Sequence, residues 1–157
     1  MYLLYFILWI IFNGAFTLEL AIIGFILTTF IFMFKRKYIG YSLKTEKKLY
    51  ITSFKLIRYF TVLLIEIVKA NISVVHIILS ERHEIEPVLV SFTTDLKTDF
   101  AKVLLANSIT LTPGTITAEL EGNEFRVHAL DKDFAIGMDD SIFVLMLRDI
   151  EKLWFER

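Results

Sequence analysis

Residues 3–12 read LLYFILWIIF and residues 22–27 read IIGFIL, within an opening stretch of 34 residues that holds one charged side chain, Glu19. A helix of such residues is apolar on every side, which is typical of a helix buried in lipid or packed among other helices. The stretch ends at Lys35-Arg36-Lys37, a basic cluster that marks a cytoplasmic boundary under the positive-inside rule. The sequence therefore predicts a membrane protein.

The charge of the chain differs between its two halves. Residues 1–80 carry nine Lys and Arg against three Glu, a net of +6, whereas residues 81–157 carry eight Lys and Arg against 15 Asp and Glu, a net of −7. This asymmetry favours a membrane-embedded region, 1–80, followed by a soluble domain, 81–157, with a basic loop that faces anionic headgroups. Nucleic acid is not expected as a partner, because an acidic domain repels phosphate.

The membrane-embedded region is predicted to contain helices over about 2–12, 18–34 and 49–79. A single helix over residues 2–34 would be about 50 Å long, whereas the hydrocarbon core is about 30 Å thick and two full spans need about 40 residues. Asn13-Gly14 predicts a break, and Thr17 can cap the second helix. The sequence leaves open a tight hairpin of two short spans or one span with a bent lead-in.

Charged residues inside the apolar segments are the first candidates for a functional site. Glu66 and Lys69 stand three residues apart on the third predicted helix, a spacing that allows an ion pair. Ionisable groups at bilayer depth often lie on ion or proton paths, and Glu19 is a further candidate. We favour a structural role at a protein interface, because an ion path normally needs several such groups.

The soluble domain is predicted to be a small α+β fold with the order β-α-β-β-α. A small core of this size leans on a partner or on the membrane anchor. Pro113-Gly114 and residues 121–123 predict turns. The predicted strands cover 88–92, 115–120 and 124–130, and the predicted helices cover about 97–108 and 139–155.

Residues 106–115 read ANSITLTPGT and concentrate small polar side chains at the end of a helix and a turn. These hydroxyls and the amide can satisfy the last carbonyls of the helix and the amides of the turn. We therefore expect a structural corner that also has room for a docking role. The residues concerned are Asn107, Ser108, Thr110, Thr112, Pro113, Gly114 and Thr115.

An enzyme would use His128 with Asp131 or Asp133, but the sequence lacks a nucleophile motif such as Gly-x-Ser-x-Gly. Strand alternation places Arg126 and His128 on the face opposite Phe125. Without a nucleophile motif, a structural or hydrogen-bonding role for His128 is favoured. The histidines 76, 83 and 128 show no metal-binding spacing, and the chain has no cysteine and no phosphate-binding loop. We expect no catalytic residue, no metal site and no cofactor.

Residues 106–115, followed by Val127-His128-Ala129-Leu130, resemble the signature of the MnhE/MrpE family, the E subunits of Mrp/Mnh-type multisubunit sodium/proton antiporters. The break at Asn13-Gly14, Ile23-Gly24 and residues 66–71 (EIVKAN) fit the same family. The resemblance covers essentially the whole chain. Similar E-like subunits also occur in membrane-bound hydrogenase and related respiratory assemblies, so the resemblance does not decide to which complex the chain belongs.

The resemblance implies an accessory subunit that packs against other antiporter subunits in the plasma membrane, since ion translocation in this family is attributed to the large many-helix subunits. An anchored binding or adaptor module remains the alternative. The side of the membrane that holds the soluble domain depends on the third helix. If this helix spans completely, the domain lies outside; if it lies along the membrane or bends back, the domain stays in the cytoplasm, which we favour.

Overall fold

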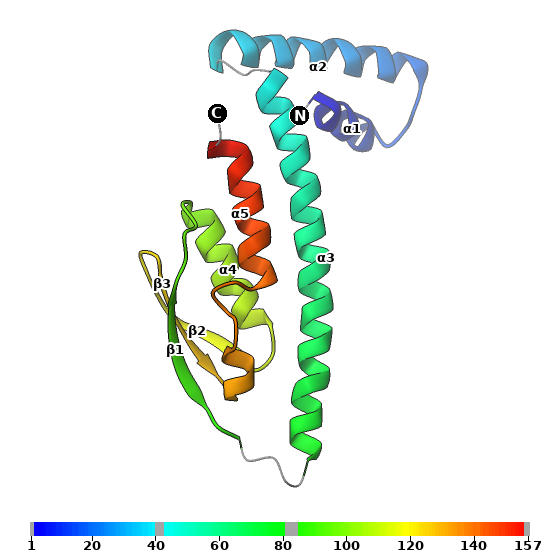
Figure 1. Ribbon diagram of the computed structural model, residues 1–157. Coiled ribbons are helices and arrows are strands. Elements are labelled where there is room, and N and C mark those ends of the chain that lie inside the picture. Colours follow the sequence, from blue (N-terminus) through cyan, green and yellow to red (C-terminus); the bar gives the residue numbers. More distant parts are fainter. Residues whose placement is uncertain (1, 40–42, 81–84, 156–157) are drawn as a thin grey trace. The chain divides into compact units, whose positions relative to one another are not determined.

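The computed structural model of the protein describes residues 2–39, 43–80 and 85–155. Its compact units are Met1–Ser53 and Phe54–Arg157, and the boundary between them falls inside a helix. Residues 81–84, where the soluble domain was predicted to begin, lie outside the described residues, as does His83. In chain order the elements are α1 (Tyr2–Asn13), α2 (Leu18–Ile39), α3 (Leu43–Leu79), β1 (Val88–Thr93), α4 (Asp99–Leu111), β2 (Thr115–Glu121), β3 (Glu124–Ala129), the 3₁₀ helix η1 (Lys132–Ala135) and α5 (Ile142–Phe155) (Figure 1).

A tight turn joins α1 and α2 at the break that Asn13-Gly14 predicts. Gly14 adopts a φ of 65°, and its N–H donates to the carbonyl oxygen of Ile11 at 3.1 Å. Thr17 caps α2, because its hydroxyl oxygen accepts from the N–H of Leu20 at 3.3 Å. With 12 residues α1 is about 18 Å long, and with 22 residues α2 is about 33 Å long. Of this pair, α2 alone is long enough to cross the hydrocarbon core.

Helices α2 and α3 are longer than the sequence predicts, whereas α5 begins at Ile142, three residues after its predicted start. Helix α2 continues through the basic cluster to Ile39, and α3 begins at Leu43, before the predicted start near residue 49. Lys, Arg and Glu are good helix formers, so the charged residues end the apolar run without ending the helix. By length and composition alone, α2 and α3 could each cross a membrane.

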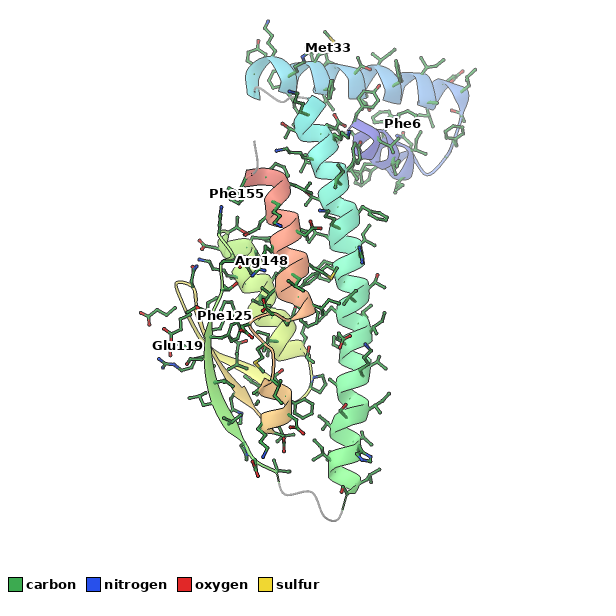
Figure 2. The ribbon with its side chains drawn as sticks, viewed as in Figure 1. Phe6, Met33, Glu119, Phe125, Arg148 and Phe155 are labelled. Atoms are coloured by element: carbon green, nitrogen blue, oxygen red, sulfur yellow. The ribbon has the colours of Figure 1, made fainter. Side chains whose placement is uncertain are left out.

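The predicted β-α-β-β-α order is present in the second unit. The three strands form an antiparallel sheet in the order β1-β3-β2, with Val90 opposite Val127 and Thr117 opposite the same residue on the other side. Phe125, Val127 and Ala129 of β3 are fully buried on one face, and Phe92 of β1 stacks on Phe125 with ring centroids 5.2 Å apart. Figure 2 shows Phe125 on the helix side of the sheet and Glu119 on the open side. The short helix η1 was not predicted.

Residues 54–79 of α3 belong to the second unit, although their hydropathy resembles that of the membrane helices. Helices α4 and α5 cover the inner face of the sheet, and α3 packs on them from the other side (Figure 1). Tyr59 and Leu63 of α3 join the same buried cluster as Leu105, Leu147 and the strand residues. The third helix of the same chain therefore contributes to the small α+β core.

Candidate functional site

The turn between α1 and α2 presents Glu19, the charged candidate of the opening stretch. Glu19 lies in the first turn of α2, and its side chain is exposed. A carboxylate in this position is stabilised by the partial positive charge of the helix amino terminus. Its placement beside the turn follows the prediction, whereas a role in ion transfer stays a prediction.

Helices α1 and α2 meet closely at Gly24. The ring of Trp9 covers this glycine so tightly that a Cβ built on Gly24 would lie 2.9 Å from Trp9 Nε1 and closer still to Cδ1. Trp9 Nε1 donates to the carbonyl oxygen of Leu20 at 3.0 Å. Small residues that let helices approach closely are typical of packing in lipid. Gly24 therefore permits the close approach of α1 and α2.

The amino terminus of α1 is held by side chains of α3, an arrangement that sequence reasoning missed. The N–H of Tyr2 donates to Glu46 Oε1 at 2.7 Å, and the N–H of Leu3 donates to the hydroxyl of Tyr50 at 3.2 Å. Tyr50 in turn donates to Glu46 Oε1 at 3.2 Å. Glu46 is 8% exposed. It acts as a capping carboxylate supplied by another helix, and no local sequence signal marks such a cap.

Glu66 and Lys69 form the predicted ion pair, with Lys69 Nζ 2.7 Å from Glu66 Oε1. The side chain of Glu66 is 30% exposed and that of Lys69 is 64% exposed. The pair lies on the part of α3 that belongs to the second unit. Each charge thus has its partner within one helix turn, which fits the structural role that the sequence favours. Participation in ion transfer stays a prediction.

The corner at residues 106–115 is built as predicted, from hydroxyls that donate to helix carbonyls. Thr112 Oγ1 donates to the carbonyl of Ser108 at 2.8 Å, and Thr115 Oγ1 donates to that of Ile109 at 2.6 Å. Thr110 Oγ1 donates to the carbonyl of Ala106 at 2.9 Å. These bonds satisfy carbonyls near the end of α4, where helical partners run out. Asn107 is exposed on the surface of α4.

Pro113-Gly114 forms the predicted turn after α4. Gly114 adopts a φ of 97°, and a Cβ there would lie 3.1 Å from the ring of Phe134. The carbonyl oxygen of Gly114 accepts from the N–H of Leu130 at 2.8 Å, so the turn is tied to the end of β3. Both the backbone conformation and the close ring require glycine here.

Ser108 connects this corner to α3. Its hydroxyl lies 2.6 Å from that of Tyr59, and Tyr59 also contacts Phe143 with ring centroids 5.7 Å apart. Tyr59 and Ser108 are both fully buried. A serine in the middle of the 106–115 motif therefore has a defined partner: it holds α3 against α4.

His128 lies on the open face of the sheet, as the alternation predicts. It is paired in register with Leu89 of β1 and Ile116 of β2, and all three side chains are exposed. The corner hydroxyls lie on the helix side of the sheet, so the structure does not bring them together with His128. Beside it, Arg126 pairs with Glu119 at 2.7 Å.

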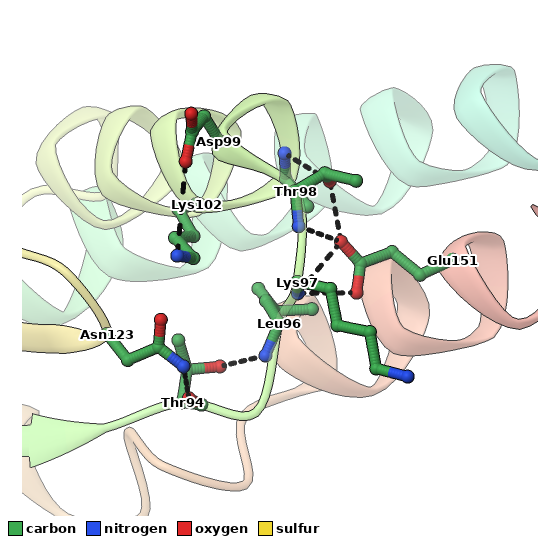
Figure 3. Close-up of polar contacts among 9 residues, drawn as sticks. Thr94, Leu96, Lys97, Thr98, Asp99, Lys102, Asn123 and Glu151 are labelled. Carbon is green, nitrogen blue, oxygen red and sulfur yellow. Dashed lines mark hydrogen bonds and ion pairs between the residues drawn. The ribbon is translucent and has the colours of Figure 1, made fainter. Parts of the chain in front are cut away.

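A second capping carboxylate joins α5 to α4. Glu151 Oε1 accepts from the N–H of Thr98 at 2.8 Å and from its hydroxyl at 2.5 Å, and Oε2 accepts from the N–H of Lys97 at 2.9 Å (Figure 3). Glu151 is 8% exposed. Thr98 also accepts from the N–H of Ala101 at 3.2 Å, as an N-cap residue does. The pattern of an amphipathic last helix gave no sign of this role.

Close to this cap, Asp95 forms a surface ion pair with Arg148. Arg148 Nη2 lies 2.8 Å from Asp95 Oδ1. The hydrogen bond from Arg148 holds the pKa of Asp95 below its ordinary value. The side chains of Arg148 and Asp95 are 34% and 61% exposed, so the pair contributes little to stability. Within residues 2–39, 43–80 and 85–155, His, Asp and Glu form no group of three that could hold a metal ion.

The geometry defines a class of protein: a membrane-anchored component with an apolar helical hairpin and an α+β domain stabilised by a long third helix. A family model described as a Na⁺/H⁺ ion antiporter subunit matches residues 2–149. The chain is 36% identical to the E1 subunit of the Na⁺/H⁺ antiporter of Staphylococcus haemolyticus over 82% of its length and 77% of the relative. It is 30% identical to the E subunit of the Na⁺/H⁺ antiporter of Alkalihalophilus pseudofirmus over 80% of its length and 77% of that protein. The chain belongs to this family, the E subunits of Na⁺/H⁺ antiporters.

A solved structure shows a similar fold. A chain of the membrane-bound sulfane sulfur reductase, an archaeal respiratory membrane complex, superposes with a TM-score of 0.57 at 25% sequence identity. The match covers 95% of both chains. The predicted membership of the family is thereby confirmed by sequence, and the membrane-helix plus α+β fold is confirmed by structure.

Proposed function

We propose that the chain is an accessory, non-catalytic subunit of a multisubunit monovalent cation/proton antiporter, where it supports assembly and stability of the membrane complex. The proposal rests on the exposure of apolar side chains in the first unit. Among the described residues of the first unit, the buried positions are Gly24, Thr28 and Glu46, while large apolar side chains such as Ile26 and Phe30 are exposed. Apolar helices with so little internal core are expected to be covered by lipid and by foreign helices.

The charged candidates support an accessory role. Glu66 and Lys69 neutralise each other, and Glu19 lies at a helix end beside a turn. An ion path needs a succession of polar groups along a cavity. Larger subunits with many helices are better suited to provide one, so we assign this chain no catalytic residue.

Deleting the chain while retaining its partners tests the proposal. We expect the remaining subunits to fail to assemble into a stable complex and Na⁺/H⁺ antiport to be lost in everted vesicles. Re-expression of the intact chain should restore both. A fully assembled and fully active antiporter in the absence of the chain would contradict an assembly role.

The α+β domain belongs, in this proposal, on the cytoplasmic side. The basic residues at the end of α2 favour the cytoplasm, and the chain after them stays on that side if α3 does not span the membrane. Single cysteines at Lys47→Cys and Glu121→Cys, both exposed positions, should react with a membrane-impermeant maleimide from the same side. Labelling from opposite sides would place the domain outside.

A second candidate is an E-like subunit of a respiratory membrane complex. The fold match over 95% of both chains to the sulfane sulfur reductase complex favours it specifically. Purification of the tagged chain in mild detergent, followed by mass spectrometry, separates the candidates. Co-purifying antiporter subunits support the first, whereas redox subunits support the second.

A further inference from the structure

Within the second unit, helix α3 has a packed face, an exposed apolar face and a basic edge along the apolar face. One side, which includes Tyr59 and Leu63, packs on the α+β domain. The opposite side is an apolar surface that we call the outer stripe: Phe54, Ile57, Leu64, Val68, Ile72 and Val75, each between 52% and 72% exposed. Arg58 and Lys69 follow the edge of this stripe, eleven residues or three helix turns apart, and both are exposed.

The α+β domain contacts α3 along a length that equals the thickness of the hydrocarbon core of a bilayer. Near the start of this stretch, Lys55 Nζ lies 2.7 Å from Asp149 Oδ2 of α5. Near its end, His76 and Ser80 line a pocket together with Asp133. From residue 55 to residue 76 the helix rises about 32 Å. An upright α3 would therefore carry charged groups of the domain into the hydrocarbon, where ionised side chains are costly.

The outer stripe itself is chemically suited to lipid. From Phe54 to Val75 it extends over about 32 Å and holds large aliphatic and aromatic side chains. Close helix–helix contacts in membranes favour small side chains instead. The polar groups within or beside it are satisfied by their own helix. Thr61 Oγ1 donates to the carbonyl of Ile57 at 2.9 Å, and Asn71 Nδ2 donates to that of Ile67 at 2.8 Å. One donor of each side chain is thus satisfied within the helix, which lowers the cost of burying these groups in lipid.

We propose that α3 lies in the plane of the membrane surface, with its outer stripe embedded in the lipid of an anionic leaflet. Arg58 then reaches the headgroups at the edge of the stripe, while Lys69 on the same edge stays paired with Glu66. The α+β domain covers the helix from the aqueous side. An apolar stripe with basic residues along its edge is the pattern of an interfacial amphipathic helix. This proposal concerns a lipid surface and stands apart from the assembly role.

Spin labels on the outer stripe test the proposal in the intact antiporter, reconstituted in bilayers that contain phosphatidylglycerol. The chain has no native cysteine, so Ile57→Cys, Leu64→Cys, Val68→Cys and Val75→Cys each provide one label on an already exposed position. Accessibility to oxygen and to a water-soluble nickel chelate gives the depth of each label. Glu121→Cys, an exposed position of the α+β domain, is the water-facing control.

We expect the four stripe labels to report one common depth, about 5–10 Å below the headgroups, and the control to be accessible to nickel. In an upright helix the labels at 57 and 75 would differ by about 27 Å in height, so a graded depth would overturn the proposal. Labels inaccessible to both reagents would also overturn it, because another protein would then cover the stripe. Normal complex assembly of each variant keeps these outcomes separate from the proposed assembly role.

Discussion

The two units of the chain bury opposite kinds of residue. In the first unit the described buried positions are Gly24, Thr28 and Glu46, and the apolar side chains point outward. In the second unit the buried positions are mainly apolar, with Leu105 and Phe125 fully enclosed. The first unit is therefore held by close backbone approach and polar bonds, as in lipid, and the second by burial of apolar surface, as in water.

Both units contain a helix whose amino terminus is capped by a glutamate from a distant point in the sequence. Glu46 of α3 caps the amino terminus of α1, and Glu151 of α5 caps that of α4, each from a distant point in the sequence. A helix amino terminus has N–H groups without helical partners in either solvent. Backbone polar groups therefore set the same requirement in both units, while the exposure of apolar side chains depends on the surrounding solvent.

The largest expected effect comes from emptying the core of the second unit. Leu147 is 1% exposed, so Leu147→Ala should lower the free energy of unfolding by about 2–5 kcal/mol, because it removes buried methyl groups and leaves a cavity. Hydrogen exchange of the β3 amides in the detergent-solubilised chain measures this loss in the free energy of unfolding. Leu145→Ala, half exposed on the same helix, is the matched control and should change little.

The same truncation in the first unit should behave differently. Ile26 is 60% exposed, so Ile26→Ala should leave hydrogen exchange of the isolated chain unchanged. Its effect should appear only as weaker co-purification with partner subunits. A loss of stability in the isolated chain equal to that of Leu147→Ala would remove the distinction between the units.

Gly24→Leu should separate α1 from α2. Trp9 leaves no room for a larger side chain, so overpacking is expected to cost about 1–3 kcal/mol and to expose the α1 amides to exchange. Trp9→Ala in the same chain makes room and should partly reverse the effect, which would show that the two residues are coupled. Additive effects of the two substitutions would contradict the contact.

Glu151→Gln tests the cap of α4. The amide supplies one acceptor where the carboxylate supplies two, and it turns its own N–H groups toward those of Lys97 and Thr98. We expect a loss of about 1–2 kcal/mol, seen as faster exchange in the first turn of α4. Lys152→Gln, an exposed neighbour, should leave that turn unchanged. Equal effects of the two variants would mean that Glu151 is not a cap.

Asp95 should give the smallest effect, and one that depends on pH. Its pKa is lowered in the folded chain, so the pair with Arg148 stabilises the fold above the ordinary pKa of an aspartate, and this contribution is lost as the pH falls through the folded pKa. Because the pair is exposed, we expect less than about 1 kcal/mol. Asp95→Asn should remove this part of the pH dependence of unfolding; an unchanged acid profile would contradict it.

Much of the fold follows from local sequence. Strand alternation placed Phe125 and His128 on opposite faces, Asn13-Gly14 marked the hairpin, and the spacing of Glu66 and Lys69 gave their ion pair. These features depend on neighbours within a few residues.

Other features depend on contacts between distant residues and could not be read locally. The caps by Glu46 and Glu151 join helices 44 and 53 residues apart along the chain, and a lone Glu on a helix gives no signal of such a role. The packing of α3 on the α+β domain could not be predicted from the sequence for a different reason. Apolar residues at helical spacing look alike whether they face lipid or a core.

Transport by the isolated chain is the most direct test of the claim that it is a component without its own ion path. The purified chain, reconstituted alone in sealed liposomes, should show no exchange of sodium for protons above that of empty liposomes. Added to a preparation that lacks this component, the same chain should restore exchange. Sodium/proton exchange by the chain alone would contradict the claim.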